Sequence, residues 1–299
     1  MKLKFKLILT AIEITALAAV VNHYFKLIMK TKRSCCSNHP YESSYSYRFG
    51  TVRYTKKGSG APMLLLHSPN IGGSKSEWDT IIDTLSKNHT VYAPDLPGFG
   101  HSAQPEMPYS SYLYASFIND FVENVIGIPT VALASGKSAD FLLCASSFKE
   151  GNFRKLVLIS PTGFKNMPQK CPCRLVAKRV MELPLYGTFL YNMAWLDFMT
   201  FSFIRRYLLR INPKHSPGFS DQTSKFALSA LLSGNLNLDV RSMATKIGVP
   251  ILIALGSTDN IGGIPAEIEA LMFCELNGMP HLAYDNDKFI SETLAWLKK

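Results

Sequence analysis

The stretch 130–142 could carry nucleophilic chemistry, because a short apolar run leads there directly into a helical pattern. A serine held on a sharp turn between a strand and a helix exposes a hydroxyl that can attack a carbonyl carbon. We place Ser138 on that turn, since Gly136 is small enough for strand and helix to pack closely two positions before it. Asp140, two positions after it, does not meet this requirement. A second register, centred on Lys137, has small residues at both ends.

The elements that must position this turn alternate between apolar strands and helical segments. Continuous apolar runs of four to eight residues are typical of strands buried on both faces of a parallel sheet. Residues 63–66 form such a run, and residues 91–93, 130–135, 156–160 and 249–255 are the further predicted strands. Helical periodicity follows several of them, as in residues 77–85. The alternation predicts an α/β fold with a mostly parallel central sheet flanked by helices and right-handed crossovers.

Two motifs resemble a known family. Residues 95–102 read Asp-Leu-Pro-Gly-Phe-Gly-His-Ser after one predicted strand, while His67 ends another and Trp78 lies on the next helix. Together they resemble the α/β-hydrolase superfamily. The resemblance covers residues 48–165 well and residues 247–299 more loosely. It implies the α/β-hydrolase fold, with Ser138 as the nucleophile.

The resemblance also implies an acid and a base, since the serine proton must be taken by a base that a carboxylate orients. Asp259, in Gly-Ser-Thr-Asp directly after a strand, resembles the family's acid position. His281 is the candidate base. If the tripeptide 280–282 is aligned on the one that often follows the family's histidine, however, the catalytic position falls on Gly278.

The resemblance further implies backbone N–H groups that hold an oxyanion. One is expected from Ala139, which follows the predicted nucleophile. The other is expected from the loop after the first buried strand, where Pro69 has no N–H to donate. Asn70 or Ser68 would therefore supply the second donor.

Changes of composition divide the chain into five predicted segments. They are an N-terminal membrane helix at 1–33, a polar linker at 34–47, an α/β part at 48–163, a helical insertion at 164–240 and a second α/β part at 241–299. The resemblance implies that 48–163 and 241–299 are the two parts of the hydrolase core and that the insertion is a cap. Nineteen residues from Leu7 to Phe25 can just span a bilayer, although Glu13 interrupts them. A cleaved signal peptide and an amphipathic surface helix are the alternatives. Lysines at both ends leave the side of the membrane open.

The net charge of +10 is concentrated at the N-terminus. Residues 1–33 hold seven Lys or Arg and one Glu, a net charge of +6, which leaves +4 for the rest. This distribution favours an anionic membrane surface as a partner over nucleic acid, for which no binding motif is present. We expect no cofactor and no metal, since Cys171-Pro-Cys173 lacks the second ligand pair of a zinc site.

Two functions are consistent with these patterns. The first is a membrane-tethered serine hydrolase, esterase-like or lipase-like, that cleaves an ester, thioester or amide with an apolar acyl part through an acyl-enzyme. The second is a catalytically inactive α/β-hydrolase fold that acts as a membrane-associated binding or scaffold module. Asp140, Pro69 and the position of His281 favour the second function. Neither the natural substrate nor the oligomeric state follows from the sequence.

Overall fold

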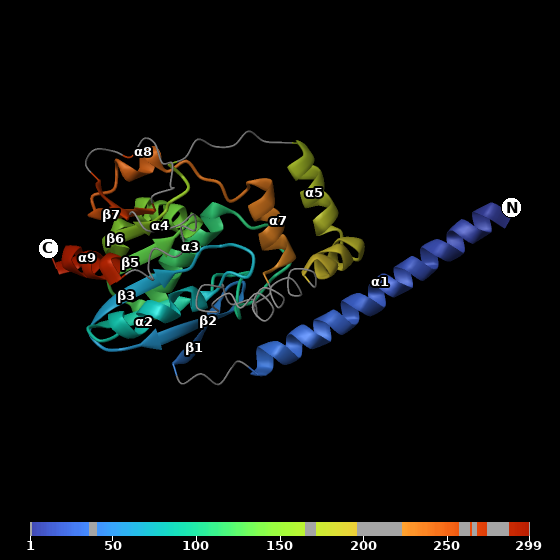
Figure 1. Cartoon of the computed structure of the whole chain (residues 1–299), viewed down its shortest axis with the longest axis horizontal. Coiled ribbons are helices and arrows are strands. Elements are labelled where there is room, and N and C mark those ends of the chain that lie inside the picture. Colours follow the sequence, from blue (N-terminus) through green and yellow to red (C-terminus); the bar gives the residue numbers. More distant parts are fainter. Residues whose placement is uncertain are drawn as a thin grey trace.

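The computed structural model of the chain describes residues 2–35, 41–164, 172–195, 223–256, 264, 268–273 and 287–298. Within them, eight strands form one sheet in the order β1-β2-β4-β3-β5-β6-β7-β8 (Figure 1). The strands are β1 Glu42–Tyr47, β2 Gly50–Lys57, β3 Ala61–Leu66, β4 His89–Pro94, β5 Thr130–Ser135, β6 Phe153–Ile159, β7 Ile251–Gly256 and β8 Glu269–Phe273. At one edge β1 pairs antiparallel with β2, and β2 pairs antiparallel with β4; the other described pairings are parallel. The predicted mostly parallel sheet is confirmed.

Helices cover both faces of this sheet (Figure 1). Those of the core are η1 Lys75–Trp78, α2 Asp79–Leu85, α3 Ser111–Phe121, η2 Val122–Ile126, α4 Lys137–Phe148, η3 Glu150–Asn152, α8 Arg241–Ala244 and α9 Asp287–Lys298. The stretch predicted as a cap contains α5 Pro172–Glu182, a helix at 186–195 and α7 Lys225–Ser233. The helices that follow strands supply the predicted α/β layering.

The central strands divide the core into two apolar layers because successive side chains of a strand point to opposite faces. Met63 and Leu65 of β3 pack in one cluster with side chains of α2 and α9. Leu64 and Leu66 pack in the other with side chains of α3, α4 and α7. All four β3 side chains are fully buried. Strand β3 therefore lies at the centre of the sheet, beside β5, and its C-terminal end adjoins the stretch predicted to carry the nucleophile.

One strand lies where we predicted part of a polar linker. β1 falls within residues 34–47 and forms a hairpin with β2. Its aromatic side chains explain this difference, because Tyr47 is buried against Phe117 with ring centroids 5.2 Å apart. Tyr45 also donates a hydrogen bond to Asp120 at 2.7 Å. Tyrosines that alternate along the segment thus anchor it to α3 as an edge strand.

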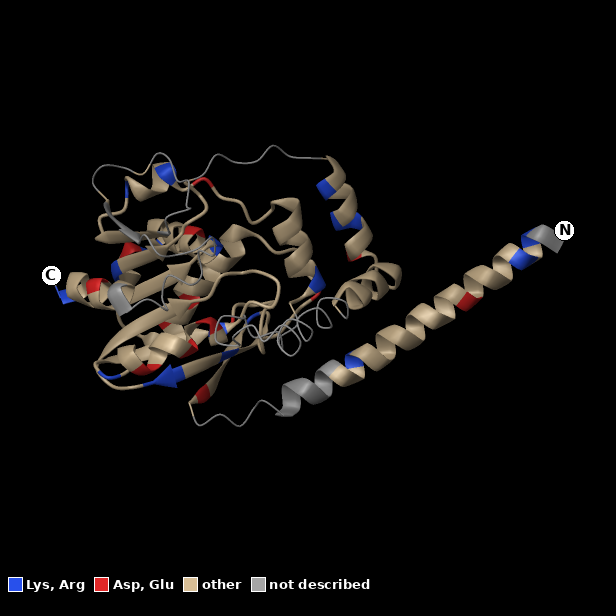
Figure 2. Cartoon of the chain, viewed as in Figure 1, with Lys and Arg blue, Asp and Glu red and all other residues tan. Residues whose placement is uncertain are grey.

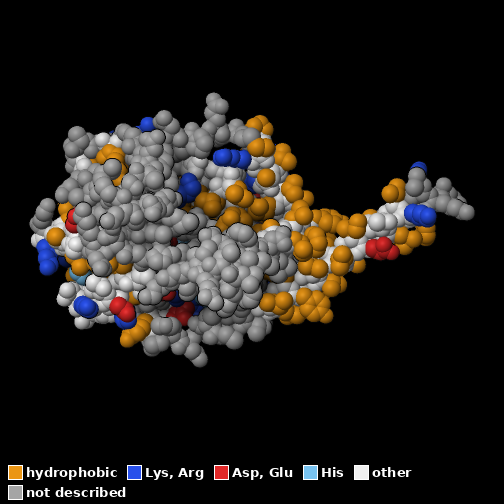
Figure 3. Space-filling model, viewed as in Figure 1, with side chains coloured by type: hydrophobic (Ala, Val, Ile, Leu, Met, Phe, Trp, Pro, Cys, Tyr) orange, Lys and Arg blue, Asp and Glu red, His pale blue; other side chains and the backbone are white. Residues whose placement is uncertain are grey.

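The N-terminal helix α1, Lys2–Cys35, extends away from the core (Figure 1). Its segment Lys4–Ile28 has a mean hydropathy of 1.7 and is long and apolar enough to cross a membrane. A signal sequence near an N-terminus can have the same length and hydropathy. Glu13 is the acidic residue in the middle of this segment (Figure 2). Exposed apolar side chains cover much of the visible face of the helix (Figure 3).

Candidate functional site

The turn between β5 and α4 is centred on Gly136, not on Ser138. Gly136 has a φ of 57° and a ψ of −125°, a backbone conformation that residues with side chains rarely adopt. Its N–H donates to the carbonyl of Ile159 at 2.9 Å, which fixes the turn to the end of β6. The residues two positions to either side are Ala134 and Ser138, both small. This is the geometry of a strand-to-helix elbow, with a glycine at the position that would hold a nucleophile.

The predicted nucleophile Ser138 lies two residues further on, in the first turn of α4. Its side chain is fully buried, and its hydroxyl donates a hydrogen bond to the backbone carbonyl of His67 at 2.5 Å. That bond ties the start of α4 to the C-terminal end of β3. The hydroxyl is therefore directed into the protein and engaged with backbone, whereas an attacking serine needs a base on its proton and room for substrate.

The side chain of Ser68 fills the space next to the elbow. A Cβ atom added to Gly136 would lie 2.5 Å from the Ser68 Oγ and 3.3 Å from the Ser68 Cβ. The first distance is far inside van der Waals contact, so a serine at position 136 would need the 68 side chain to move. A glycine at the elbow and a serine opposite it are thus complementary in shape.

The N–H groups predicted to hold an oxyanion all donate within the protein. The N–H of Ser68 donates to the carboxylate of Glu77 at 2.7 Å. The N–H of Asn70 donates to the carbonyl of Ser68 at 3.0 Å, and that of Ala139 donates to the carbonyl of Gly136 at 3.2 Å. An oxyanion hole requires donors aimed at the developing charge. The donors of Ser68 and Asn70 instead hold the loop after β3, and that of Ala139 closes the first turn of α4.

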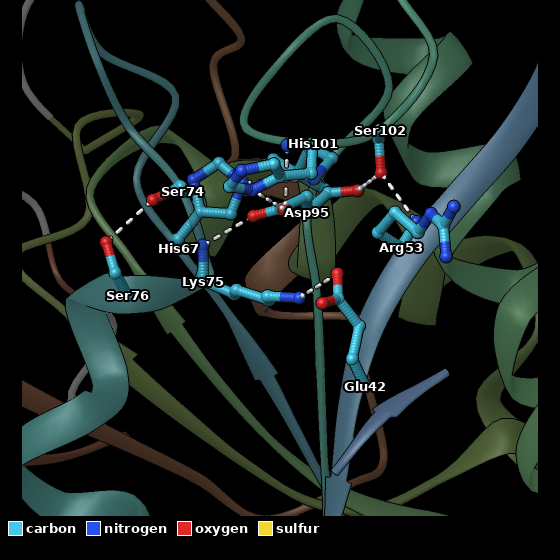
Figure 4. A network of polar contacts seen from close by, with 10 residues as sticks. Glu42, Arg53, His67, Ser74, Lys75, Ser76, Asp95, His101 and Ser102 are labelled. Atoms are coloured by element: carbon cyan, nitrogen blue, oxygen red, sulfur yellow. Dashed lines mark hydrogen bonds and ion pairs between the residues drawn. The ribbon is translucent and has the colours of Figure 1, made fainter. Parts of the chain in front are cut away.

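A buried polar network fixes the loop with the Asp-Leu-Pro-Gly-Phe-Gly-His-Ser sequence against the end of β3 (Figure 4). The carboxylate of Asp95 accepts from the N–H of Lys75 at 2.7 Å and from the N–H of His101 at 2.9 Å. Burial opposes ionisation of Asp95, but the hydrogen bond of His101 and the charge of Lys75 outweigh it, so its pKa is lowered. The Nε2 of His67 accepts from the N–H of Leu96 at 3.0 Å. These groups have a structural role at the site.

Asp140, which had no place in the predicted elbow, has a defined structural position. Its carboxylate accepts from the N–H of Gly163 at 2.8 Å and from the N–H and hydroxyl of Thr162 at 3.1 and 2.5 Å. It thereby holds the loop after β6 against the first turn of α4. Burial raises the pKa of Asp140 to about 6 despite these donors. With Gly136 on the turn, the small residue required two positions later is Ser138. Position 140 therefore does not need a small residue, and Asp140 can hold the loop after β6.

The remaining predictions concern the catalytic acid and base, metal binding and the cysteines. Asp259 and His281 lie outside the described residues, so their roles stay predictions. Among the described residues no group of three His, Cys, Asp or Glu side chains could hold a metal ion. Cys144 is buried, and burial raises the pKa of its thiol to about 11. Cys173 is disulfide-bonded.

Sequence reasoning missed Gly136 as the elbow residue. The signal was present, since Ala134 and Ser138 are small residues two positions before and after it. Searching for a serine at the centre of the pattern hid this register, because it presumes that the nucleophile is retained.

Three curated proteins with similar sequences each match a part of this chain. A 2-hydroxy-6-oxo-6-(2'-aminophenyl)hexa-2,4-dienoic acid hydrolase from Metapseudomonas resinovorans is 34% identical over 27% of this chain and 30% of its own length. The human protein named 1-acylglycerol-3-phosphate O-acyltransferase ABHD5 is 29% identical over 43% of this chain and 38% of its own. A mouse (lyso)-N-acylphosphatidylethanolamine lipase is 30% identical over 36% and 32%. The chain thus spans about a third of the length of these curated relatives.

Similarity to solved structures covers most of the chain. A hydrolase from Pseudomonas aeruginosa PA01 superimposes with a TM-score of 0.66 over 88% of this chain and 100% of its own, at 16% identity. The enol-lactonase from Burkholderia xenovorans LB400 gives 0.66 over 86% and 100%, also at 16%. At such identities the likeness shows the fold alone. Residues 63–287, well over half of the sequence, match the profile of the alpha/beta hydrolase family. The chain therefore belongs to the α/β-hydrolase family.

Proposed function

We propose that this chain uses the α/β-hydrolase fold as a membrane-associated binding module and forms no acyl-enzyme at its elbow. The observation that carries the proposal is Gly136, which occupies the turn where the family's chemistry requires a side-chain nucleophile. Glycine has no side chain to attack a carbonyl. The nearest predicted substitute, Ser138, is buried and bonded to backbone.

Two further features support a loss of hydrolytic chemistry. Ser68 fills the space beside the elbow, so this part of the site is closed by protein atoms. The loop after β3 has Pro69 without an N–H and neighbours whose N–H groups are already used. With Gly136 on the turn, the donor after the elbow residue would be the N–H of Lys137 and not that of Ala139. Restoring a nucleophile alone would still leave the N–H groups of Ser68 and Asn70 engaged within the protein, and loss of an oxyanion donor is costly in rate.

We propose a ligand with a largely apolar part, held at an anionic membrane surface. The apolar segment of α1 supports the membrane, and lysines at positions 4, 6 and 26 support contact with anionic headgroups. Two relatives have names that refer to acyl lipids, a 1-acylglycerol-3-phosphate and an N-acylphosphatidylethanolamine. A membrane lipid or its acyl derivative is therefore the ligand class we propose.

The competing function is a serine hydrolase for ester-type bonds, in which Ser138 attacks, His281 moves the proton and Asp259 orients His281. The hydrolase names among the relatives favour it. It would require the Ser138 hydroxyl to leave the carbonyl of His67 and to reach substrate from within α4. The similarity covers only about a third of those relatives, so their activity is a candidate for this chain.

A fluorophosphonate probe separates the two functions, since it reacts covalently with an activated serine. The full chain, purified in detergent, is incubated with the probe beside an active serine hydrolase in the same detergent. We expect labelling of the reference enzyme alone. Labelling of this chain that disappears in Ser138→Ala would overturn the proposal, provided that the variant keeps the parent's thermal unfolding profile.

A further inference from the structure

α1 is docked on the cap along one face rather than held apart as a free tether. Thr15, Ala18, Asn22 and Phe25 recur at intervals of three and four, so they share one side of the helix. Among residues 4–28 of α1, whose side chains the structure describes, Ala18 and Phe25 are buried, whereas every residue from 4 to 14 is exposed. The C-terminal half of the apolar segment therefore contacts protein, and the N-terminal half extends beyond it (Figure 1).

Polar groups in this contact satisfy one another. The amide of Asn22 donates to the carbonyl of Leu185 at 3.1 Å and accepts from the amide of Asn192 at 2.9 Å. The hydroxyls of Thr15 and Tyr186 are 2.7 Å apart. Paired side-chain amides and hydroxyls between helices are the way polar residues are tolerated where water is absent.

An apolar cluster completes the contact. Phe25 packs with Tyr191 and Trp195 of the 186–195 helix and with Leu228 of α7, and all four are less than a tenth exposed. Burial of such large apolar side chains stabilises the contact. α1 and the helical insertion therefore form one packed unit.

The cap surface beside this contact is itself apolar. Side chains exposed by 40 to 59% project from α5, the segment that follows it and the 186–195 helix; they are Leu175, Val176, Val180, Leu183, Leu190 and Met193. Figure 3 shows hydrophobic surface on this side of the molecule that continues onto α1. A continuous exposed apolar patch of this kind marks an interaction surface.

The depth of α1 indicates what covers that patch. Thr15 lies 11 residues from Lys4 and 13 from Ile28, or about 17 and 20 Å at the rise of an α-helix. If the segment crosses a bilayer, whose apolar layer is about 30 Å thick, Thr15 lies near its middle. Tyr186, which is hydrogen-bonded to Thr15, then lies within the apolar layer together with its helix. The leaflet concerned is the one that the C-terminal half of α1 crosses.

We propose that α5 and the 186–195 helix are embedded in one leaflet of a bilayer beside α1, with lipid acyl chains against the exposed apolar side chains of the cap. The basic residues Arg174 and Arg179, both exposed on α5, can extend toward anionic headgroups while their stems lie along the apolar surface. The inference rests on the membrane association in the proposed function. It adds that the cap, and not only the tether, is in contact with lipid.

Photo-crosslinking in vesicles tests this contact directly. The full chain is placed in vesicles of phosphatidylcholine and phosphatidylglycerol with p-benzoylphenylalanine in place of Val176 or Leu190, and lipid adducts are measured by mass spectrometry. Ile128 and Phe148, exposed by 52 and 56% on the core, are matched control positions. We expect lipid adducts at 176 and 190 at least tenfold above those at 128 and 148.

A fifth position, Leu9 of α1, distinguishes failure of this inference from failure of membrane association. Adducts at Leu9 with none above control at 176 and 190 would overturn the embedding of the cap and leave the tether intact. No adducts at any of the three would overturn membrane association itself, and the embedding with it. Cross-links from 176 or 190 to a second copy of the chain would show that protein, not lipid, covers the patch. They would equally overturn the inference.

Discussion

Replacement of Gly136 by alanine tests the glycine elbow. The added Cβ would cost stability in two ways, through backbone strain and through a clash with Ser68. A residue with a side chain at a φ of 57° and a ψ of −125° is strained by roughly 1–3 kcal/mol. Its Cβ would also lie 2.5 Å from the Ser68 Oγ, and overpacking of this kind costs about 1–3 kcal/mol. We therefore expect Gly136→Ala to lower the free energy of unfolding by about 2–6 kcal/mol.

A double-mutant cycle with Ser68→Gly separates these costs, because removing the 68 side chain relieves the clash and leaves the backbone strain. The double variant should be more stable than the sum of the single effects by about 1–2 kcal/mol. Denaturant unfolding of the full chain in detergent, followed by tryptophan fluorescence, measures all four proteins. Trp78 and Trp296 report on the core, since both are buried.

Two glycines provide matched controls. Gly127 has a φ of 78° with no atom within 4 Å of an added Cβ, so Gly127→Ala should cost only the roughly 1 kcal/mol of a left-handed backbone. Gly151 also has open space and no such φ, so its alanine variant should be close to neutral. If Gly136→Ala costs no more than Gly127→Ala and shows no coupling to position 68, Gly136 is not the elbow residue and the reasoning is refuted.

Three further predictions concern the groups around the elbow and the cap. Ser138→Ala should lower the free energy of unfolding by about 1–2 kcal/mol through loss of its bond to His67, and unchanged stability in denaturant would contradict a structural role. Because the folded pKa of Asp140 is raised to about 6, its contribution to stability is fully present below about pH 4 and is lost as pH rises toward 6. Asp140→Asn should therefore reduce the change of the unfolding free energy with pH between pH 4 and 6. An unaltered pH profile would refute the raised pKa of Asp140. Asn22→Ala should accelerate amide hydrogen exchange in the 186–195 helix, since it removes two hydrogen bonds; equal exchange would argue against docking.

The fold could be predicted because its signals are local and redundant. Apolar runs such as 63–66 and 130–135 mark buried parallel strands, and each lies in an observed strand. The linker prediction for 34–47 overlooked β1 because the strand depends on Tyr45 and Tyr47 meeting α3, a contact that is distant in sequence. Local polarity alone favoured a loop there.

The elbow register was harder to predict because it depends on one backbone conformation. Small residues lie at positions 134, 135, 136, 138 and 139, so the registers centred on 136 and on 137 both satisfy the demand for small residues. Which residue takes the positive φ is decided by pairing of β5 with β6 and by the space that Ser68 leaves. Asp140 seemed to conflict with an elbow only because Ser138 was assumed to be its centre.

Intact mass after reaction with a fluorophosphonate tests the absence of an elbow nucleophile most directly. The full chain is incubated with excess probe in detergent and in vesicles, and any adduct is located by peptide mapping. A glycine at the elbow predicts an unchanged mass and an unmodified peptide spanning residues 130–148. A stoichiometric adduct on Ser138 would contradict it.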